Sequence, residues 1–439
     1  MELQALKDLV QAAGVVGAGG AGFPTYGKLS GTVDTVILNC AECEPLLKLH
    51  RQLLEEYTEE ILAALGEILR ATGARQGIVA VKKHYRSTVA ALQAEIGGHK
   101  DIRIHTLPSV YPMGDEIILI KEVTGRTVQP GSLPATVGVT VCNVETVYNV
   151  YRALHGKPVT HKYVTVAGEV KNPMTLRAPI GTPISELVKA AGGTTAEDVV
   201  YLSGGPMMGK LVSPRDTVTK TTNAIIVLPA GHTVVLNKQR NAKIGLRRAM
   251  SVCCQCRTCT ELCSRHTAGY PVQPHMVMRV LSNGGKGDLV TLSGSLFCSG
   301  CGLCEAYSCP QGLSPRTLIA ELKASARTAG YKPEGITAEE SVKDADLHKV
   351  SVARLTMRLG LKKYDVPAPL VDGFGVKSVK ILLSQHIGAP AVPCVKEGDM
   401  VKEGDPIAQA AEGALSVGIH ASIGGKVTAV TDNYIKINA

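Results

Sequence analysis

The stretch SVCCQCRTCTELCSRHT (251–267) decides how this chain is interpreted, because it places five cysteines within eleven residues. Its spacing over 253–263 is C-x2-C-x2-C-x3-C, and a second group over 298–310 reads C-x2-C-x2-C-x4-C-P. The opening C-x2-C-x2-C is a tight loop that can fold three thiolates around one cuboidal iron–sulfur cluster. Two such groups predict two clusters and therefore a one-electron relay.

In ferredoxins with two clusters, the fourth cysteine of each group ligates the other cluster. One predicted 4Fe-4S cluster is therefore held by Cys253, Cys256, Cys259 and Cys309. The other is held by Cys298, Cys301, Cys304 and Cys263. Two structural zinc sites are the alternative, because they also use four thiolates. The triple C-x2-C-x2-C favours clusters, since zinc sites typically use two C-x2-C pairs.

The chain has 439 residues, which suggests about three domains, and 13 cysteines in all. The remaining five are expected to be small buried hydrophobes, with Cys254 a bystander: Cys40, Cys43, Cys142, Cys254 and Cys394. The start, MELQALKDLVQAAG, predicts an amphipathic helix over 2–13 and lacks the pattern of a signal peptide. No stretch is long and apolar enough for a transmembrane segment. We therefore expect a cytoplasmic protein, in which clustered thiols bind metal.

The charge and the aromatic content narrow the class further. The formal net charge of +9 is spread along the chain, which argues against nucleic-acid binding, since that needs clustered basic residues in a recognisable module. Aromatic residues make up only 4% and there is no Trp, so aliphatic side chains must fill the cores.

The segment GVVGAGGAGFPTYGKL (14–29) formally contains G-x-G-x-x-G. A Rossmann fingerprint needs a strand before it and a helix after it, but here a helix precedes and Phe23-Pro24 follows, so that interpretation is the weaker one. Glycines there still let backbone N–H groups approach a phosphate, with Lys28 to neutralise it, although a simple turn is the alternative. The next strand, 35–40, ends just before Glu42 and Glu44, where ligands of α/β sheets bind.

Four motifs occur in a familiar order: GAGGAGFPTYGKL, LNCAECEP, YPMGDE (111–116) and VCNVETVYNV (141–150). Over about 150 residues this region resembles the NADH-oxidising flavoprotein subunit of respiratory complex I and the C subunit of the Rnf complex. That resemblance implies a domain that binds FMN non-covalently and receives hydride from NADH.

Carried over to this chain, the resemblance assigns the FMN phosphate to Gly17, Gly19, Gly20, Gly22 and Lys28, with Phe23 facing the nucleotide. It places Asn39, Glu42 and Glu44 along the flavin and ribityl chain, near the nicotinamide. Tyr111, Gly114, Asp115 and Glu116 would line the flavin and NADH pocket, and Asn143 and Thr146 would close it. Ala18 and Leu29 stand where complex I has Arg and Trp. The resemblance therefore does not assign residues to the adenine end of the NADH site, and it does not exclude NADPH as the donor.

Residues 160–228 predict strand, strand, helix and further strands, and resemble the β-grasp (soluble-ligand-binding, SLBB) domain of the same families. Its glycines Gly204, Gly205 and Gly209 are expected in turns rather than at a ligand. Residues 229–243 read as a linker. The basic residues that lead into the first cysteine group could offset cluster charge, dock an acidic partner, or simply face solvent: Arg240, Lys243, Arg247 and Arg248.

Residues 376–439 match the two halves of a biotinyl/lipoyl-type barrel-sandwich hybrid. The hairpin AAEGALSVG (410–418) has no lysine, so we expect no attached biotin or lipoate and a structural or docking role. Rnf C subunits carry this module before the flavin domain, whereas here it comes last.

The predicted fold is therefore multidomain, α/β plus α+β. The expected domains are an FMN/NADH-binding α/β domain (1–157), a β-grasp domain (158–230), a helical ferredoxin-like domain with two 4Fe-4S clusters (240–360) and an all-β barrel-sandwich hybrid (374–439).

This order is most similar to the family of cobalamin reductases of propanediol-utilisation microcompartments. The resemblance implies an NADH-dependent oxidoreductase that passes electrons through FMN and two 4Fe-4S clusters to cobalamin, with no acid–base catalytic residue. Its implied partners are a corrinoid adenosyltransferase and microcompartment shell proteins, and its implied location is a bacterial microcompartment. An Rnf-like electron-input subunit and a zinc-bound scaffold are the alternatives. The partial D-x-H-x-x-G corrinoid signature at 346–351 has Ser351 at its glycine position, and we treat it as coincidence.

Overall fold

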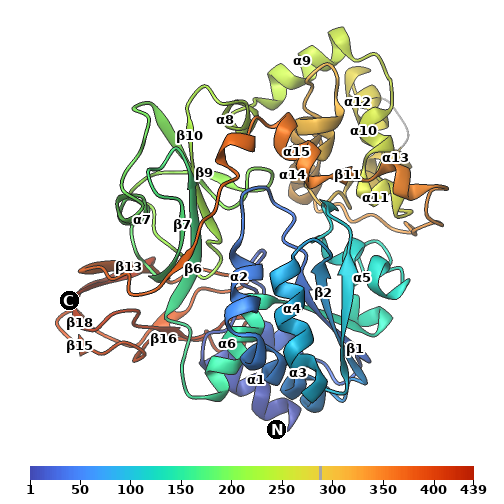
Figure 1. Ribbon diagram of the computed structural model, residues 1–439. Helices are drawn as coiled ribbons and strands as arrows, with labels where there is room; N and C mark the ends of the chain where they lie inside the picture. Colours follow the sequence, from blue (N-terminus) through green and yellow to red (C-terminus); the bar gives the residue numbers. More distant parts are fainter. Residues whose placement is uncertain (286–288) are drawn as a thin grey trace.

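The computed structural model describes residues 1–285 and 289–439. The chain runs through an N-terminal α/β unit, a green β-sheet unit, a helical unit and a red C-terminal β unit (Figure 1). The C-terminal unit returns to lie beside the N-terminal one, so the first and last units of the chain share a core.

A four-stranded parallel sheet in the order β3-β2-β1-β5 forms the centre of the N-terminal unit. The strands are β1 (Thr35–Cys40), β2 (Gln76–Lys82), β3 (Ile102–Leu107) and β5 (Val139–Asn143). The helices are α1 (Leu3–Ala12), α2 (Leu49–Glu56), α3 (Thr58–Thr72), α4 (Arg86–Glu95), α5 (Glu116–Thr124) and α6 (Val144–Leu154).

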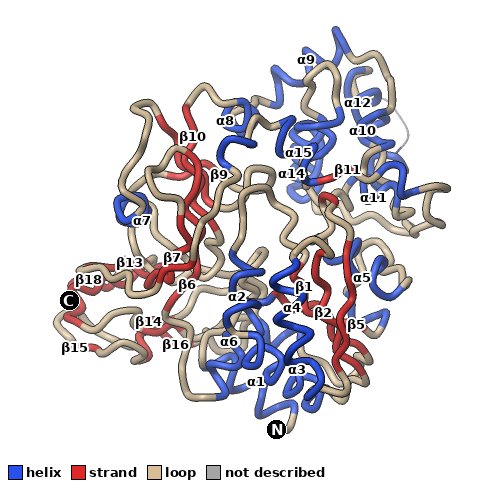
Figure 2. The backbone as a smooth tube through the Cα atoms, viewed as in Figure 1, coloured by secondary structure: helices blue, strands red, loops and turns tan. Residues whose placement is uncertain are grey.

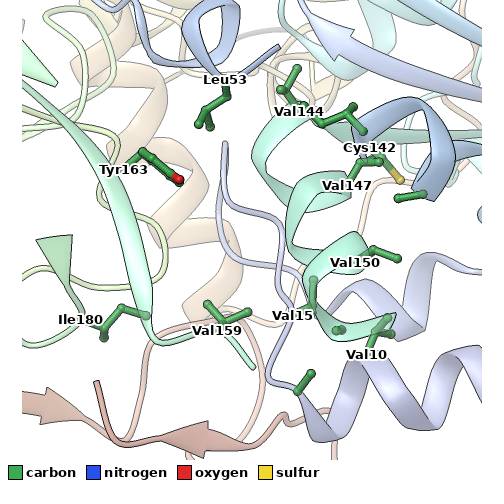
Figure 3. Packing of buried hydrophobic residues seen from close by; sticks show 14 of the residues in the cluster. Val10, Val15, Leu53, Cys142, Val144, Val147, Val150, Val159, Tyr163 and Ile180 are labelled. Carbon is green, nitrogen blue, oxygen red and sulfur yellow. The ribbon is translucent and has the colours of Figure 1, made fainter. Parts of the chain in front are cut away.

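The sheet is buried on both faces, as its apolar strands require. Val36, Leu38 and Cys40 alternate onto one face and pack with α1, α2, α3 and α6, whereas Ile37 points to the opposite face with α5. Figure 3 shows the first core, in which Val144, Val147 and Val150 of α6 line up towards Val10 and Val15.

The second unit is a six-stranded mixed sheet in the order β12-β7-β6-β10-β8-β9, with helix α7 (Ile184–Ala190) packed on it. Its strands are β6 (His161–Gly168), β7 (Met174–Pro179), β8 (Val199–Ser203), β9 (Lys210–Val212), β10 (Ala224–Pro229) and β12 (Leu370–Val371). The strand, strand, helix and strand order expected for a β-grasp fold is present. The edge strand β12, however, comes from far along the chain.

The third unit is helical and holds both cysteine groups. Its helices are α9 (Ala242–Val252), α10 (Thr258–Glu261), α11 (Ser264–Thr267), α12 (Pro274–Ser282), α13 (Leu289–Ser295), α14 (Pro315–Thr328) and α15 (Val352–Arg358). One cluster of buried apolar residues, Ala249, Met278, Leu313 and Leu318, joins α9, α12 and α14.

The C-terminal unit is a pair of small antiparallel sheets, visible as red strands in Figure 2. One contains β13 (Ser378–Leu382), β15 (Met400–Val401), β18 (Gly425–Val430) and β19 (Tyr434–Asn438). The other contains β14 (Val392–Pro393), β16 (Pro406–Gln409) and β17 (Ile419–His420).

The hairpin 410–418 exposes its tip, residues 412–414, but its second half packs on the N-terminal unit. There the side chain of Gln11 donates to the carbonyl oxygen of Ser416 at 3.1 Å. The buried side chain of Lys220 donates to the carbonyl oxygens of Gly14 and Gly418, at 2.7 and 2.9 Å, and so joins three units at one point.

Two expectations need correction, and one strand pairing between units was not anticipated. The segment 229–243 is not a plain linker, because it contains helix α8 (Thr233–Lys238), whose Val234 and Val235 are buried in a core shared by the second and third units. Short strand β11 (Val350–Ser351) pairs with β4 (Val110–Tyr111) of the N-terminal unit. Of the five cysteines outside the two groups, Cys254 and Cys394 are exposed rather than buried.

Candidate functional site

The carboxyl ends of β1 and β5 define the candidate flavin site. Asn39 and Asn143 are register partners at these ends, so their side chains stand next to each other on the same face of the sheet. In the sheet, β2 pairs with one edge of β1 and β5 pairs with its other edge, so the strand order reverses between β1 and β5. In open α/β sheets, such a reversal of strand order opens a crevice in which ligands bind.

The glycine loop closes over this crevice. A bridge between Val16 and Pro24 pinches the loop at its base, and Gly17 N–H donates to the carbonyl oxygen of Phe23 at 2.9 Å. Gly19 and Gly20 are exposed at the tip. A Cβ at Gly19 would lie 2.4 Å from Asn143 Nδ2, so any larger residue there would have to displace the Asn143 side chain.

The predicted closing residues support the loop. Thr146, in the first turn of α6, accepts a hydrogen bond from Ala18 N–H at 2.9 Å. Asn143 caps the same helix by accepting from Glu145 N–H, and its amide also contacts His50 Nε2 at 3.0 Å. The structure therefore brings the loop, Asn143 and Thr146 together as one rigid wall.

Lys28 is held beside the crevice rather than free in solvent. Its ammonium group pairs with Glu116 Oε1 at 2.9 Å and reaches the carbonyl oxygen of Val141 at 3.4 Å. Asn39 Nδ2 donates to the carbonyl oxygen of Gly114 at 3.2 Å, just before α5. The exposed glycines of the loop and the ammonium group of Lys28 supply the kinds of donor that bind phosphate.

The carboxyl groups of Glu42 and Glu44 both accept hydrogen bonds from backbone N–H groups. Glu42 has a positive φ of 23° and a buried carboxyl group that accepts from His50 N–H at 2.9 Å, while its second oxygen has no partner among the described residues. Burial raises the pKa of this carboxyl group. Glu44 accepts from Met207 and Met208 N–H, each at 2.8 Å, and so fastens the second unit to this edge of the sheet.

Tyr111 and Asp115 face the helical unit. The hydroxyl of Tyr111 donates to the carbonyl oxygen of Cys301 at 2.6 Å. Asp115 caps α5 and binds the guanidinium of Arg265, with Nη2 at 2.9 Å from both carboxylate oxygens. Two residues predicted for the flavin pocket are therefore also the contacts to the cysteine loops.

The predicted cluster ligands are called quartet 1 (Cys253, Cys256, Cys259 and Cys309) and quartet 2 (Cys263, Cys298, Cys301 and Cys304). The thiol of Cys259 lies within electrostatic range of the other three thiols of quartet 1, and the thiol of Cys304 lies within range of the other three of quartet 2. Burial, and then the nearby thiols of its own quartet, raise the pKa of Cys259 to about 12. Burial likewise raises the pKa of Cys301 to about 12, and the thiols of Cys263 and Cys298 also raise it. Thiols packed this way ionise readily only beside compensating positive charge, which the iron core of a cluster supplies.

Across residues 1–285 and 289–439, no three Cys, His, Asp or Glu side chains converge closely enough to hold a single metal ion.

Two residues of this region were missed by the sequence reasoning. Arg265 lies two positions after Cys263 and makes a nearly buried ion pair with Asp115. Cys43 accepts weakly from Gly114 N–H at 3.4 Å, and burial raises the pKa of its thiol to about 11. The sequence signal for each residue was its position inside a motif. Cys43 lies in LNCAECEP, and Arg265 lies in the stretch that holds the first cysteine group.

Four family models match the chain in order. They are the Nuo51 FMN-binding domain over 10–152, the SLBB domain over 163–211, the 4Fe-4S dicluster domain over 252–314 and the RnfC barrel sandwich hybrid domain over 362–439. The predicted fold class is confirmed, and the chain carries an FMN-binding domain and a 4Fe-4S dicluster domain. The zinc interpretation is set aside. The exact domain boundaries remain predictions.

Among characterised relatives, the chain is 41% identical to the cobalamin reductase PduS of Citrobacter freundii, over 99% of this chain and 97% of that one. It is also 41% identical to the protein of the same name from Salmonella typhimurium, over 98% and 96%. The C subunit of the Na⁺-translocating ferredoxin:NAD⁺ oxidoreductase complex of Acetobacterium woodii is 34% identical, over 61% and 59%.

Among solved structures, an NAD⁺-reducing [NiFe]-hydrogenase in the H2-reduced state matches with a TM-score of 0.50 and 22% identity. The match covers 76% of this chain and 64% of that one, and it supports the fold alone. None of the helices in the described part of the chain combines the length and apolar character that crossing a bilayer requires.

Proposed function

The chain belongs to the family of the PduS cobalamin reductases, and from this premise we propose that it transfers electrons from NADH, through FMN and two 4Fe-4S clusters, to the cobalt of cobalamin. When bound, FMN converts the two-electron hydride of NADH into single electrons that clusters can carry. The residues of this chain bind and orient these groups, and no acid–base dyad is required.

One observation carries the proposal, the hydrogen bond from Tyr111 to the carbonyl oxygen of Cys301. It connects the segment YPMGDE, at the candidate flavin pocket, directly to a loop of quartet 2 without an intervening element. The nearly buried Asp115–Arg265 pair makes a second such connection, next to Cys263. We infer that quartet 2 lies on the flavin side of the relay and that quartet 1, with its exposed Cys256, lies on the exit side.

The candidate flavin pocket is assigned as follows. The exposed N–H groups of the glycine loop and the ammonium group of Lys28 bind the FMN phosphate. Asn39 and Asn143, adjacent at the strand ends, orient the flavin and ribityl chain. The ion pair between Lys28 and Glu116 keeps the lysine positioned before a phosphate arrives.

Electrons balance in this scheme. Oxidation of one NADH to NAD⁺ releases two electrons and one proton. These electrons reduce two Co(III) centres to Co(II), or one Co(III) centre to Co(I). Neither outcome needs a further oxidant or a covalent bond to the protein.

The wider setting is proposed on the names of the relatives. We infer that a corrinoid adenosyltransferase consumes the reduced corrinoid and that the protein works with shell proteins inside a propanediol-utilisation microcompartment. The second candidate is electron exchange between NADH and ferredoxin, which the 34% identity to the Acetobacterium woodii protein favours.

The test is anaerobic NADH oxidation by FMN- and iron-reconstituted protein, with hydroxocobalamin or ferredoxin as the acceptor. Cys256→Ser and Cys254→Ser form a matched pair, because both cysteines are exposed and only Cys256 belongs to quartet 1. We expect Cys256→Ser to abolish cobalamin reduction and Cys254→Ser to preserve it. Rapid ferredoxin reduction with little cobalamin reduction by the unmodified protein would replace the proposed function with the second candidate.

A further inference from the structure

A groove of about 440 Å³ lies on the helical unit, between α10, α15 and the turn 304–308. Its volume falls within the range of small-molecule sites, roughly 300–1,000 Å³. None of the residues predicted for the flavin pocket lines it, so it is separate from the crevice at β1 and β5.

Both cysteine loops form the floor of this groove. Thr258 lies between Cys256 and Cys259, and its hydroxyl contacts Cys256 Sγ at 3.3 Å. Leu262 directly precedes Cys263 of quartet 2. Tyr307 and Ser308 lie in the turn that connects Cys304 of quartet 2 to Cys309 of quartet 1. A molecule in the groove would therefore rest on the loops of both quartets at once.

The groove is also lined by two arginines of α15 that carry positive charge. Arg354 and Arg358 lie one helical turn apart on α15, so their side chains share one face. Both are exposed, and within residues 1–285 and 289–439 neither side chain makes an ion pair. The acidic side chain on α10, Glu261, already contacts Arg257 at 3.4 Å and His348 at 3.8 Å. It is therefore not an ion-pair partner of Arg354 or Arg358.

Two like charges at this spacing repel each other, and an anion between them relieves the repulsion. In proteins, arginine guanidinium groups commonly bind phosphate or carboxylate groups. Between them, Met357 leaves 60% of its surface exposed, and Tyr307 adds an aromatic side chain. The groove therefore combines an anion site with an adaptable apolar surface.

We propose that this groove binds the electron acceptor, a corrinoid whose phosphodiester lies between Arg354 and Arg358 and whose ring edge rests against Met357 and Tyr307. The inference rests on the proposed function, which supplies the corrinoid. The phosphodiester of cobalamin provides the single negative charge, and the methyl groups that its corrin ring carries at the edge, among the amide side chains, contact the exposed methionine. The acceptor gains electrons in place, and no bond to the protein forms or breaks.

The experiment measures equilibrium binding of hydroxocobalamin and of cobinamide, which lacks the phosphodiester, to oxidised holoprotein. The test variant is Arg354→Gln/Arg358→Gln, and the matched control is Arg327→Gln, an exposed arginine on α14 of the same unit. We expect the double variant to bind hydroxocobalamin at least about tenfold more weakly, with a much smaller change for cobinamide. The control should match the unmodified protein. Iron and FMN content show whether each variant is intact.

Two results would overturn the proposal in different ways. If the unmodified protein reduces cobalamin and the intact double variant binds it equally well, the groove is not the acceptor site, although the proposed function stands. If the unmodified protein neither binds nor reduces cobalamin but reduces ferredoxin, the proposed function falls and this inference falls with it.

Discussion

The hydroxyl of Tyr111 donates a 2.6 Å hydrogen bond to the main-chain carbonyl oxygen of Cys301, and both residues are buried. Burial holds the pKa of Tyr111 well above its ordinary value, so the hydroxyl keeps its proton and remains a donor across the working pH range. The bond sets the separation between the candidate flavin pocket and a loop of quartet 2.

Tyr111→Phe should therefore slow reduction of the clusters by NADH and lower the free energy of unfolding by roughly 1–3 kcal/mol, because the Cys301 carbonyl loses its partner. Stopped-flow absorbance of the holoprotein measures the first effect and urea unfolding the second. Tyr270→Phe is the matched control, since its buried hydroxyl donates to the carbonyl oxygen of Val128 at 2.6 Å between the same two units. It should lose similar stability without slowing the clusters. Equal reduction rates in the two variants would contradict the role given to Tyr111.

Cross-ligation between the two cysteine groups predicts a pattern of iron loss. Cys263→Ser and Cys309→Ser should each remove about half of the iron, since each breaks one four-thiolate set. Adding Cys301→Ser to Cys263→Ser should cost no further iron, because both belong to quartet 2. Adding Cys309→Ser to Cys263→Ser should remove nearly all of it.

Iron and acid-labile sulfide analysis after anaerobic reconstitution checks this pattern, and Cys254→Ser serves as the control that loses none. If Cys263→Ser and Cys301→Ser together lose nearly all of the iron, Cys263 and Cys301 serve different clusters and the assignment of the two quartets is wrong.

Lys28→Gln should raise the dissociation constant of FMN by about tenfold or more, because it removes the cation beside the glycine loop and leaves Glu116 to repel the phosphate. FMN fluorescence during titration of the apoprotein measures the constant. Lys100→Gln, at an exposed position away from the loop, should leave it unchanged. Comparable FMN affinity in the two variants would remove Lys28 from the site.

Lys220 should give stability a dependence on pH. Burial lowers its pKa to about 7, whereas the unfolded chain has the ordinary value of 10.5. Between these two values the unfolded state binds more protons, so the free energy of unfolding rises with pH by up to about 1.4 kcal/mol per unit. Below about pH 7 this contribution no longer changes.

Lys220→Met lacks that titration, so the difference in unfolding free energy between it and the unmodified protein should change steadily from pH 7 to 9. His386 and His420, the two histidines near Lys220, have pKa values lowered by burial and stay neutral across this window. Parallel pH profiles from urea unfolding would show that Lys220 keeps its ordinary pKa in the folded protein.

Local patterns in the sequence predicted local structure well. The apolar run TVILNC is strand β1 from Thr35 to Cys40, and the alternating HKYVTVAG is β6. The cysteine spacing predicted a dicluster domain, because ligand spacing is itself a local property of the chain. The family resemblance singled out the glycine loop, Asn143 and Thr146, and in the structure these residues contact one another.

Contacts between units could not be predicted in the same way. Glu44 binds the backbone of Met207 and Met208, and Asp115 binds Arg265, across more than a hundred residues of chain. Such pairs depend on how separately folded surfaces meet, and no periodicity encodes that. Helix α8 was missed for a related reason. Its Val234 and Val235 are buried by residues of the second and third units, and the local sequence does not reveal such contacts.

The packing of the C-terminal module on the glycine loop has a consequence for how the protein is made. A Cβ at Gly22 would lie 3.0 Å from His386 Cα, and one at Gly14 would lie 2.4 Å from the carbonyl oxygen of Gly418, so a module that is translated later supports a loop that is translated earlier. The loop therefore lacks this support until residues 385–418 have emerged from the ribosome. We expect nascent chains stalled after residue 375 to capture FMN much more weakly than chains carrying the whole module, which would make flavin loading a late, post-translational step.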